Sequence, residues 1–189
     1  MPLPAPAARR LAHTRSIECR GYERTDGLWD IEGHLTDVKT EPHARPDGSR
    51  AVEPGEHVHD MWLRLTIDLD YRIHAAQAVM DAGRYPMCGE VTPNFASLEG
   101  LSIGRGFKKA AAERIGGTLG CTHMTELLGR MATAAYQATN RARAQREGYS
   151  SENSARRLVD SCHAYAAVSP VVLRRWPQHY TGPRPEASE

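Results

Sequence analysis

The sequence predicts an α+β fold, in which helices pack on one face of an antiparallel sheet of about three to five strands. Residues 57–69 alternate apolar and polar side chains, which is the pattern of a half-buried strand. Residues 124–135 place apolar side chains three and four positions apart, which is the pattern of an amphipathic helix. Strand-like segments come first and helix-like segments second, and this order is typical of α+β domains.

The first two strands are expected at residues 15–24 and 28–40. They flank Asp26-Gly27, and an Asp-Gly pair between two strand-like segments is a strong hairpin signal. Alternate residues of the second strand share one face, and these are Trp29, Ile31, Gly33, Leu35, Asp37 and Lys39.

The next segments continue the sheet after a break. Residues 41–55 contain several Pro and Gly and are expected to form an exposed loop. The strand at 57–69 follows and directs Met61, Leu63, Leu65, Ile67 and Leu69 to the core. Residues 73–81 fit either a neighbouring strand or an alanine-rich helix.

Helices are expected in the second half. Thr92-Pro93 fits the start of a short helix, with proline in the first helical position. A second short helix is expected over 106–115, before a pair of glycines. The longest helix is expected just after Cys121 and runs to about Arg143. Residues 158–180 are expected to pack back on the body.

Length and composition limit the organisation and the class of protein. At 189 residues, the chain has room for one domain, expected at 13–181, between flexible tails at 1–12 and 182–189. The 24 basic and 23 acidic residues give a charge of +1, which argues against a dedicated nucleic-acid partner. We find no segment with the length of a membrane span or a signal peptide, so we expect no membrane partner and a cytoplasmic location.

Five residues near the ends of predicted elements have side chains that bind metals. His57 and His59 are two positions apart in a strand, so they are expected to share its core face. Cys88 precedes the helices, and Cys121 and His123 lie where the chain enters the long helix, whose N-terminus favours a thiolate. Nitrogen and sulfur donors in this number suit a divalent ion, zinc foremost.

A structural explanation of the same five residues stays open. Free cysteines are often buried as small apolar side chains, so Cys88 and Cys121 fit an inert core equally well. The histidine pair fits hydrogen bonding to the backbone or to Asp60. The cysteines are also too few and too scattered for a disulfide framework.

Other polar residues are candidates for catalysis and substrate binding. Asp37 and Lys39 continue the apolar face of their strand, so they are expected at a cleft where they, with Asp60, move protons. The alternative is that this strand end carries ordinary surface charges. Around the hairpin, a pocket for a planar ligand would be lined by Tyr22, Asp26 and Trp29, although simple packing explains such aromatics as well.

Several short motifs follow one another in a characteristic order. They are the run from Thr25 to Gly33 with Asp37 and Lys39, then His59-Asp60-Met61, Cys88, Gly106-Phe107 and Gly120-Cys121-Thr122-His123. This order resembles a bacterial family known as domain of unknown function 2889, over most of the chain. The resemblance implies a setting in the degradation of aromatic and other unusual carbon sources.

A second similarity, at the level of the fold, is to NifU-like iron–sulfur scaffold proteins. Their ligand cysteines come before a core strand, after the strand pair and at the start of a long helix. Cys88 and Cys121 match the middle and the last cysteine, and His57 and His59 fall where that family has Cys and Asp. Imidazole in place of thiolate shifts the preference from an iron–sulfur cluster toward zinc.

These inferences lead to one main hypothesis and two rivals. We expect a small zinc-dependent enzyme that acts on an aromatic small molecule, as a carbon–carbon lyase that releases formaldehyde from a hydroxymethyl-bearing intermediate. Hydrolysis fits the same residues. The first rival is an accessory protein that passes a metal or an iron–sulfur cluster to another enzyme, and the second is a metal-free protein. A homo-oligomer is compatible with all three.

Overall fold

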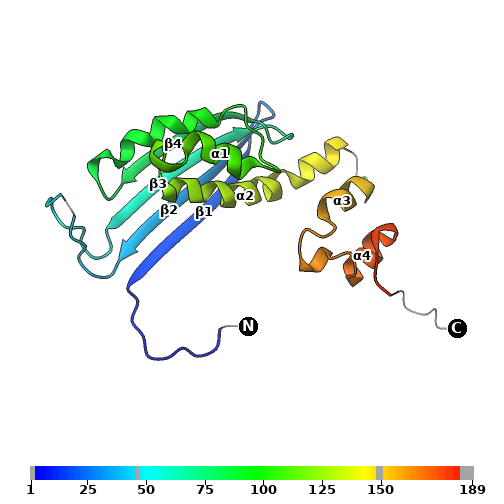
Figure 1. The fold of residues 1–189 in the computed structure, drawn as a ribbon, viewed down its shortest axis with the longest axis horizontal. Coiled ribbons are helices and arrows are strands. Elements are labelled where there is room, and N and C mark those ends of the chain that lie inside the picture. The colour runs from blue at the N-terminus through cyan, green and yellow to red at the C-terminus, as the bar shows by residue number, and fades with distance from the viewer. Residues whose placement is uncertain (1–2, 46, 148–150, 184–189) are drawn as a thin grey trace. The chain divides into compact units, whose positions relative to one another are not determined.

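The computed structural model describes residues 3–45, 47–147 and 151–183. The chain forms two compact units, Met1–Thr139 and Asn140–Glu189, which are described separately below (Figure 1). This division does not test the expectation of a single domain over 13–181, which stays a prediction.

The two predicted tails are only partly described. Residues 3–12 contain no helix or strand, and the same is true of residues 181–183. The remaining positions of those tails, 1–2 and 184–189, lie outside the described residues.

The first unit is built on a four-stranded antiparallel sheet in the order β1-β2-β3-β4. Its strands are β1 (His13–Glu23), β2 (Trp29–Lys39), β3 (His57–Ile67) and β4 (Ile73–Ala82). The α+β class and the number of strands agree with the sequence prediction. The structure also decides between the two alternatives for 73–81, because these residues form a strand.

The β1–β2 hairpin forms where the Asp-Gly signal placed it. Gly27 has φ +83°, a left-handed conformation that glycine adopts without a steric penalty. The Asp26 carboxylate accepts a hydrogen bond from the Leu28 backbone N–H at 3.2 Å and so stabilises the turn. This turn sets the register that pairs Arg15 with Asp37.

One face of the sheet forms the core with the helices. Alternate residues of β2 and β3 are fully buried there, including Ile31, Leu35, Met61, Leu63 and Leu65. Figure 1 shows the helices of this unit on a single face of the sheet, as the sequence predicted. The opposite face carries the polar residues of the same alternation, among them Glu32 and Arg64, which form an ion pair at 2.6 Å.

Four helical elements follow the sheet in the first unit. They are η1 (Pro86–Leu98), α1 (Phe107–Ile115), η2 (Gly117–Leu119) and α2 (Thr122–Glu147). The positions of α1 and α2 agree with the sequence prediction. The first element differs, because it begins at Pro86 and contains Pro93 within it. Pro86 occupies the first helical position that we had assigned to Pro93.

Helix α2 lies close to the sheet at two glycines. A Cβ atom at Gly21 would come within 2.5 Å of the Ala138 Cβ, and one at Gly33 within 2.8 Å of the Met131 Sδ. The absence of side chains on β1 and β2 at these points lets the helix approach the strands. This approach fixes the start of α2 relative to the strand ends.

The second unit contains residues 140–147 of α2 and four short helices, α3 (Ser151–Leu158), η3 (His163–Tyr165), α4 (Pro170–Arg175) and η4 (Pro177–His179). Its small core consists of Ala155, Val172 and Trp176. Ser169 caps α4, since its hydroxyl oxygen accepts a hydrogen bond from the Val172 N–H. Among the described residues of both units, none of the helices has the length and apolar character that crossing a membrane requires.

Candidate metal centre

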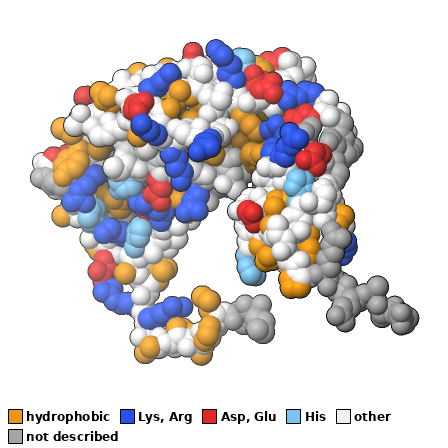
Figure 2. All heavy atoms as spheres, turned by 45° about the vertical axis from the view of Figure 1, so that its right-hand side comes forward, with side chains coloured by type: hydrophobic (Ala, Val, Ile, Leu, Met, Phe, Trp, Pro, Cys, Tyr) orange, Lys and Arg blue, Asp and Glu red, His pale blue; other side chains and the backbone are white. Residues whose placement is uncertain are grey.

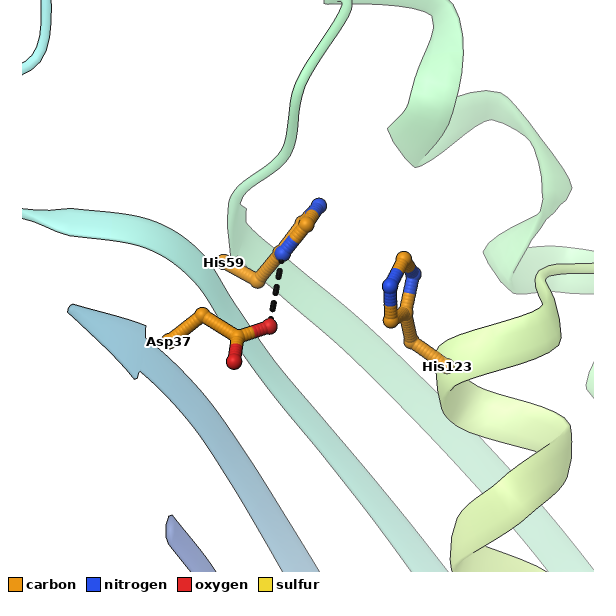
Figure 3. Close-up of side chains that lie close together, drawn as sticks. All are labelled: Asp37, His59 and His123. Carbon is orange, nitrogen blue, oxygen red and sulfur yellow. Dashed lines mark hydrogen bonds and ion pairs between the residues drawn. The ribbon is translucent and has the colours of Figure 1, made fainter. Parts of the chain in front are cut away.

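Three potential ligands from distant parts of the chain meet at one end of the sheet. Asp37 lies near the end of β2, His59 near the start of β3, and His123 in the first turn of α2 (Figure 3). One ligand atom of each residue lies within 4.8 Å of the others. Figure 2 shows several histidines, in pale blue, among basic and acidic side chains on the side from which the N-terminal segment extends.

Asp37 is the buried anchor of this group, and only 3% of its surface is exposed. Its Oδ1 lies 2.7 Å from His13 Nε2 and accepts a hydrogen bond from Arg15 Nε at 2.9 Å. Its Oδ2 accepts a second hydrogen bond from Arg15, through Nη2 at 2.8 Å, and lies 2.8 Å from His59 Nδ1. A carboxylate offers about four acceptor positions. All four acceptor positions of the Asp37 carboxylate are therefore occupied.

These contacts determine the charge of Asp37. Burial by itself would raise the pKa of the carboxyl group, but the hydrogen bonds from Arg15, His59 and His13 outweigh burial and hold the pKa well below its usual range. The hydrogen bond to Asp37 in turn raises the pKa of the Arg15 guanidinium. Asp37 is consequently an anion in the folded protein, as a metal ligand or an acceptor for a histidine N–H must be.

The two histidines lie against each other. The ring centroids of His59 and His123 are 4.2 Å apart, and the ring planes make an angle of 35°. Because His59 Nδ1 lies 2.8 Å from the anionic Asp37, this nitrogen is the donor to the carboxylate, and Nε2 is the ring atom left to face an ion (Figure 3). Burial lowers the pKa of His123, and positive charge at His59 and Arg15 lowers it further, so His123 is a neutral imidazole at pH 7.

The donor set fits a borderline divalent ion. Two imidazoles and one carboxylate form the ligand set of many catalytic zinc sites, which keep a position open for water or substrate. Ligands on a tetrahedral zinc ion lie about 3.4 Å apart, so the group has to contract slightly from its present spacing. Asp37 can take part in two ways. In the first, one of its oxygens binds the ion and gives up one of its present hydrogen bonds. In the second, it keeps its hydrogen bond from His59 Nδ1–H and orients that ring, so that His59 Nε2 binds the ion.

A second histidine cluster lies beside Asp60. The two oxygens of Asp60 lie 2.7 Å from His34 Nε2 and 2.6 Å from His57 Nδ1. The ring of His34 stacks on Trp62, with a centroid distance of 3.7 Å. His57 and His59 therefore have different carboxylate partners, although the sequence placed them on one strand face. The register of β2 and β3 shifts next to Asp37, between Asp37 and Val38, and this shift breaks the alternation.

The two cysteines proposed as ligands lie outside the group formed by Asp37, His59 and His123, among the described residues. Cys121 directly precedes α2, and its Sγ is 3.8 Å from His123 Nδ1. Cys88 belongs to η1 and is a free, half-buried thiol, as is Cys121. Both cysteines therefore stay predicted rather than observed members of the site.

The remaining predicted residues divide between the two ends of the sheet. Lys39 is the last residue of β2, two positions beyond Asp37. Tyr22, Asp26 and Trp29 belong to the hairpin at the opposite end, and Trp29 is part of the core with 8% exposure. Eight residues of extended β2 separate Trp29 from Asp37, a span of about 26 Å. The structure does not bring this aromatic group to the metal centre.

His13 and Arg15 are the important neighbours that the sequence analysis missed. Both lie on β1, and Arg15 also donates a hydrogen bond to Glu126 of α2 at 3.1 Å. The hairpin signal could have identified them, because a two-strand register centred on Asp26 pairs Arg15 with Asp37.

Comparisons with known proteins place the chain in a family without assigning a function. A family model described as "Protein of unknown function (DUF2889)" matches residues 13–137. No curated protein and no solved structure matches the chain. The similarity to NifU-like proteins thus gains no support and stays a prediction. Because the family model covers more than half of the sequence, the protein belongs to the family of proteins of unknown function designated DUF2889.

Proposed function

We propose that this protein is an enzyme that depends on a divalent metal ion, zinc foremost, held by Asp37, His59 and His123. The observation that carries the proposal is the convergence of their ligand atoms to within 4.8 Å from two strands and a helix. Asp37 is buried and anionic there, and His123 is a neutral imidazole. Both are in the protonation state in which they bind metal.

The donor atoms favour an enzyme over an iron–sulfur accessory protein. Iron–sulfur clusters are held mainly by thiolates, whereas the group found among the described residues consists of two imidazoles and a carboxylate. Such nitrogen and oxygen donors suit zinc and similar ions. With three protein ligands, a four-coordinate ion keeps one position for substrate.

The proposed reaction is carbon–carbon cleavage that releases formaldehyde from a hydroxymethyl-bearing aromatic compound. In this retro-aldol reaction, the hydroxyl group loses its proton, the carbon–carbon bond breaks, and the carbon left behind takes up a proton, so that no oxidant is consumed. A bound metal ion would lower the pKa of the substrate hydroxyl. Both imidazoles are ligands of the ion, so proton transfer to and from the substrate falls to the other predicted catalytic residues, Asp60 and Lys39. Arg15 keeps Asp37 anionic throughout.

Elemental analysis of natively purified protein tests the metal. We expect about one zinc ion per chain in the wild type and a loss of most of it in His123→Ala. His34→Ala is the matched control, because His34 also pairs with a carboxylate but lies outside the group. Wild-type protein without stoichiometric metal, or an equal loss in both variants, contradicts a metal centre at these residues. A brown sample with a visible absorption band supports the accessory protein instead.

An activity assay tests the reaction. Metal-loaded protein is incubated with a hydroxymethyl-bearing aromatic dimer, and formaldehyde is measured by a trapping reagent. We expect one formaldehyde per substrate consumed, and no release by His123→Ala. If the fully metal-loaded protein releases no formaldehyde from a series of such dimers, the proposed lyase reaction is contradicted, whereas the proposed metal centre is not.

A further inference from the structure

A cavity of about 590 Å³ lies along the outer side of α2, next to α1. Its lining includes Lys108 of α1, and Glu126, Gly129 and Arg130 of α2. We refer to it as the Gly129 cavity. The metal centre is connected to it through Arg15, which contacts both Glu126 and Asp37.

Two cations in the lining have free N–H groups. Lys108 and Arg130 are exposed, and within the described residues they make no hydrogen bond or ion pair. The hydroxyls of Thr125 and Thr133, also in the lining, donate to the carbonyl oxygens of Cys121 and Gly129. The donors available to a ligand in this cavity are consequently those of the lysine and the arginine.

Gly129 is the second indication of a ligand. A glycine inside a helix lowers stability relative to alanine, so its presence calls for a local reason. Packing supplies none, because the nearest atom to an added Cβ is Lys108 Cε at 3.6 Å, an ordinary contact with the end of a flexible side chain. Without a Cβ, the floor of the cavity stays open between Lys108 and Arg130.

The charge of the lining matches a ligand with a single negative charge. Lys108 and Arg130 contribute +2 and Glu126 contributes −1, which leaves +1. Glu126 is held in place by Arg15 at 3.1 Å. A singly charged carboxylate neutralises this lining, whereas a doubly charged phosphate would leave one negative charge uncompensated beside Glu126.

We propose that the Gly129 cavity binds the carboxylate group of a small molecule, and that this molecule is the substrate of the metal centre. Arg130 follows His123 by seven residues, so the two lie on the same side of α2, about 10 Å apart along its axis. A substrate that contacts both the metal centre and the Gly129 cavity therefore has about 10 Å between its reacting group and its carboxylate. This identification of the bound molecule rests on the proposed enzymatic function, whereas carboxylate binding itself does not.

The test is a titration of metal-free protein with benzoate, followed by backbone amide NMR shifts, and a parallel titration with inorganic phosphate. We expect saturable benzoate binding centred on α1 and α2, and weaker phosphate binding. Lys108→Ala and Arg130→Ala should each weaken benzoate binding by about tenfold, the effect of losing one charge-assisted hydrogen bond. Lys109→Ala is the matched control, since Lys109 is also exposed but lies outside the lining, and this variant should bind like the wild type.

Gly129→Ala separates ligand binding from folding. This variant should be at least as stable as the wild type and yet bind benzoate more weakly, because the added methyl group narrows the floor of the cavity. An absence of saturable benzoate binding, an equal loss in Lys109→Ala, or tighter binding of phosphate than of benzoate overturns the proposal. Benzoate binding should persist in His123→Ala, so failure of the metal centre and failure of this cavity give different results.

Discussion

The Gly21 backbone of β1 lies so close to Ala138 of α2 that a Cβ atom at Gly21 would be 2.5 Å from the Ala138 Cβ. This is closer than two carbon atoms can approach without a shift of the backbone. We therefore expect Gly21→Ala to reduce the free energy of unfolding by about 1–3 kcal/mol, as overpacking does elsewhere. Urea denaturation followed by circular dichroism measures the change.

Two further glycines serve as comparisons for the stability loss expected in Gly21→Ala. At Gly33 an added Cβ would meet Sδ and Cγ of the buried Met131, a side chain that can change rotamer, whereas the Ala138 Cβ cannot move without the backbone, so Gly33→Ala should cost less than Gly21→Ala. Gly89 has no atom within 4 Å of an added Cβ, and Gly89→Ala should change stability by less than about 0.5 kcal/mol. Equal losses at Gly21 and Gly89 would contradict a close approach of α2 to β1.

Replacing Asp37 by Asn should destabilise the first unit by about 2–3 kcal/mol in the absence of metal. The substitution leaves Arg15 without its ion pair and forces an amide N–H₂ against donor groups of His13 or His59. This loss of stability is small for a buried charge pair, because a third of the Arg15 side chain is exposed to solvent. Asp26→Asn, an exposed ion pair at the hairpin, serves as the control and should lose much less.

Acid should weaken the second unit through Glu147. The hydrogen bond from Arg143 lowers the pKa of Glu147 to about 2, and the hydrogen bond from Arg157 acts in the same direction. A depressed folded-state pKa stabilises the protein above the unfolded-state pKa, which is about 4.3 for Glu. That contribution is lost as the pH falls from about 4.5 toward 2.

Glu147→Gln is the variant that isolates this effect. The variant should be less stable than the wild type at pH 6, and the difference between the two should shrink as the pH approaches 2. Chemical denaturation at a series of pH values gives the comparison. A difference that stays constant over this range would show that the carboxylate charge of Glu147 does not stabilise the fold.

Removal of a bound ion should lower the melting temperature. A ligand present at about one hundred times its dissociation constant stabilises a protein by about 2.7 kcal/mol. This corresponds to a rise of roughly 5–11 °C in the melting temperature of a chain of this size. Zinc added to chelator-treated protein should produce such a rise, and His123→Ala should abolish it. The same rise in His123→Ala would place the ion elsewhere.

Much of the fold follows from local patterns in the sequence. The strict alternation in β3 and the spacing of Met124, Leu127, Leu128 and Met131 in α2 each describe one buried face, and burial of that face decides the element. The strand at Ile73 was ambiguous, because the alanines of β4 favour a helix and are less common in strands. These residues form a strand because they pair with β3, and local sequence patterns do not reveal such pairing between distant segments.

The candidate site was predicted only in part, for physical reasons. His59 and His123 were among the expected ligands, while Asp37 was expected as a catalytic residue. Their meeting depends on the register of two strands and on the depth at which α2 packs, and neither property is local in sequence. His57 was grouped with His59 by simple alternation, but the irregular pairing beside Asp37 gave it Asp60 as a partner.

Most of the hydrogen bonds that hold Asp37 come from β1, which has a neighbour on one side only. Outermost strands detach more readily than inner ones, and detachment here would leave a carboxylate in the core without its compensating guanidinium. An ion bound at the site supplies positive charge of its own. Binding of an ion at the metal centre and detachment of β1 from the sheet are therefore coupled. A bound ion makes detachment of β1 less costly, so hydrogen exchange in β1 reports on the ion.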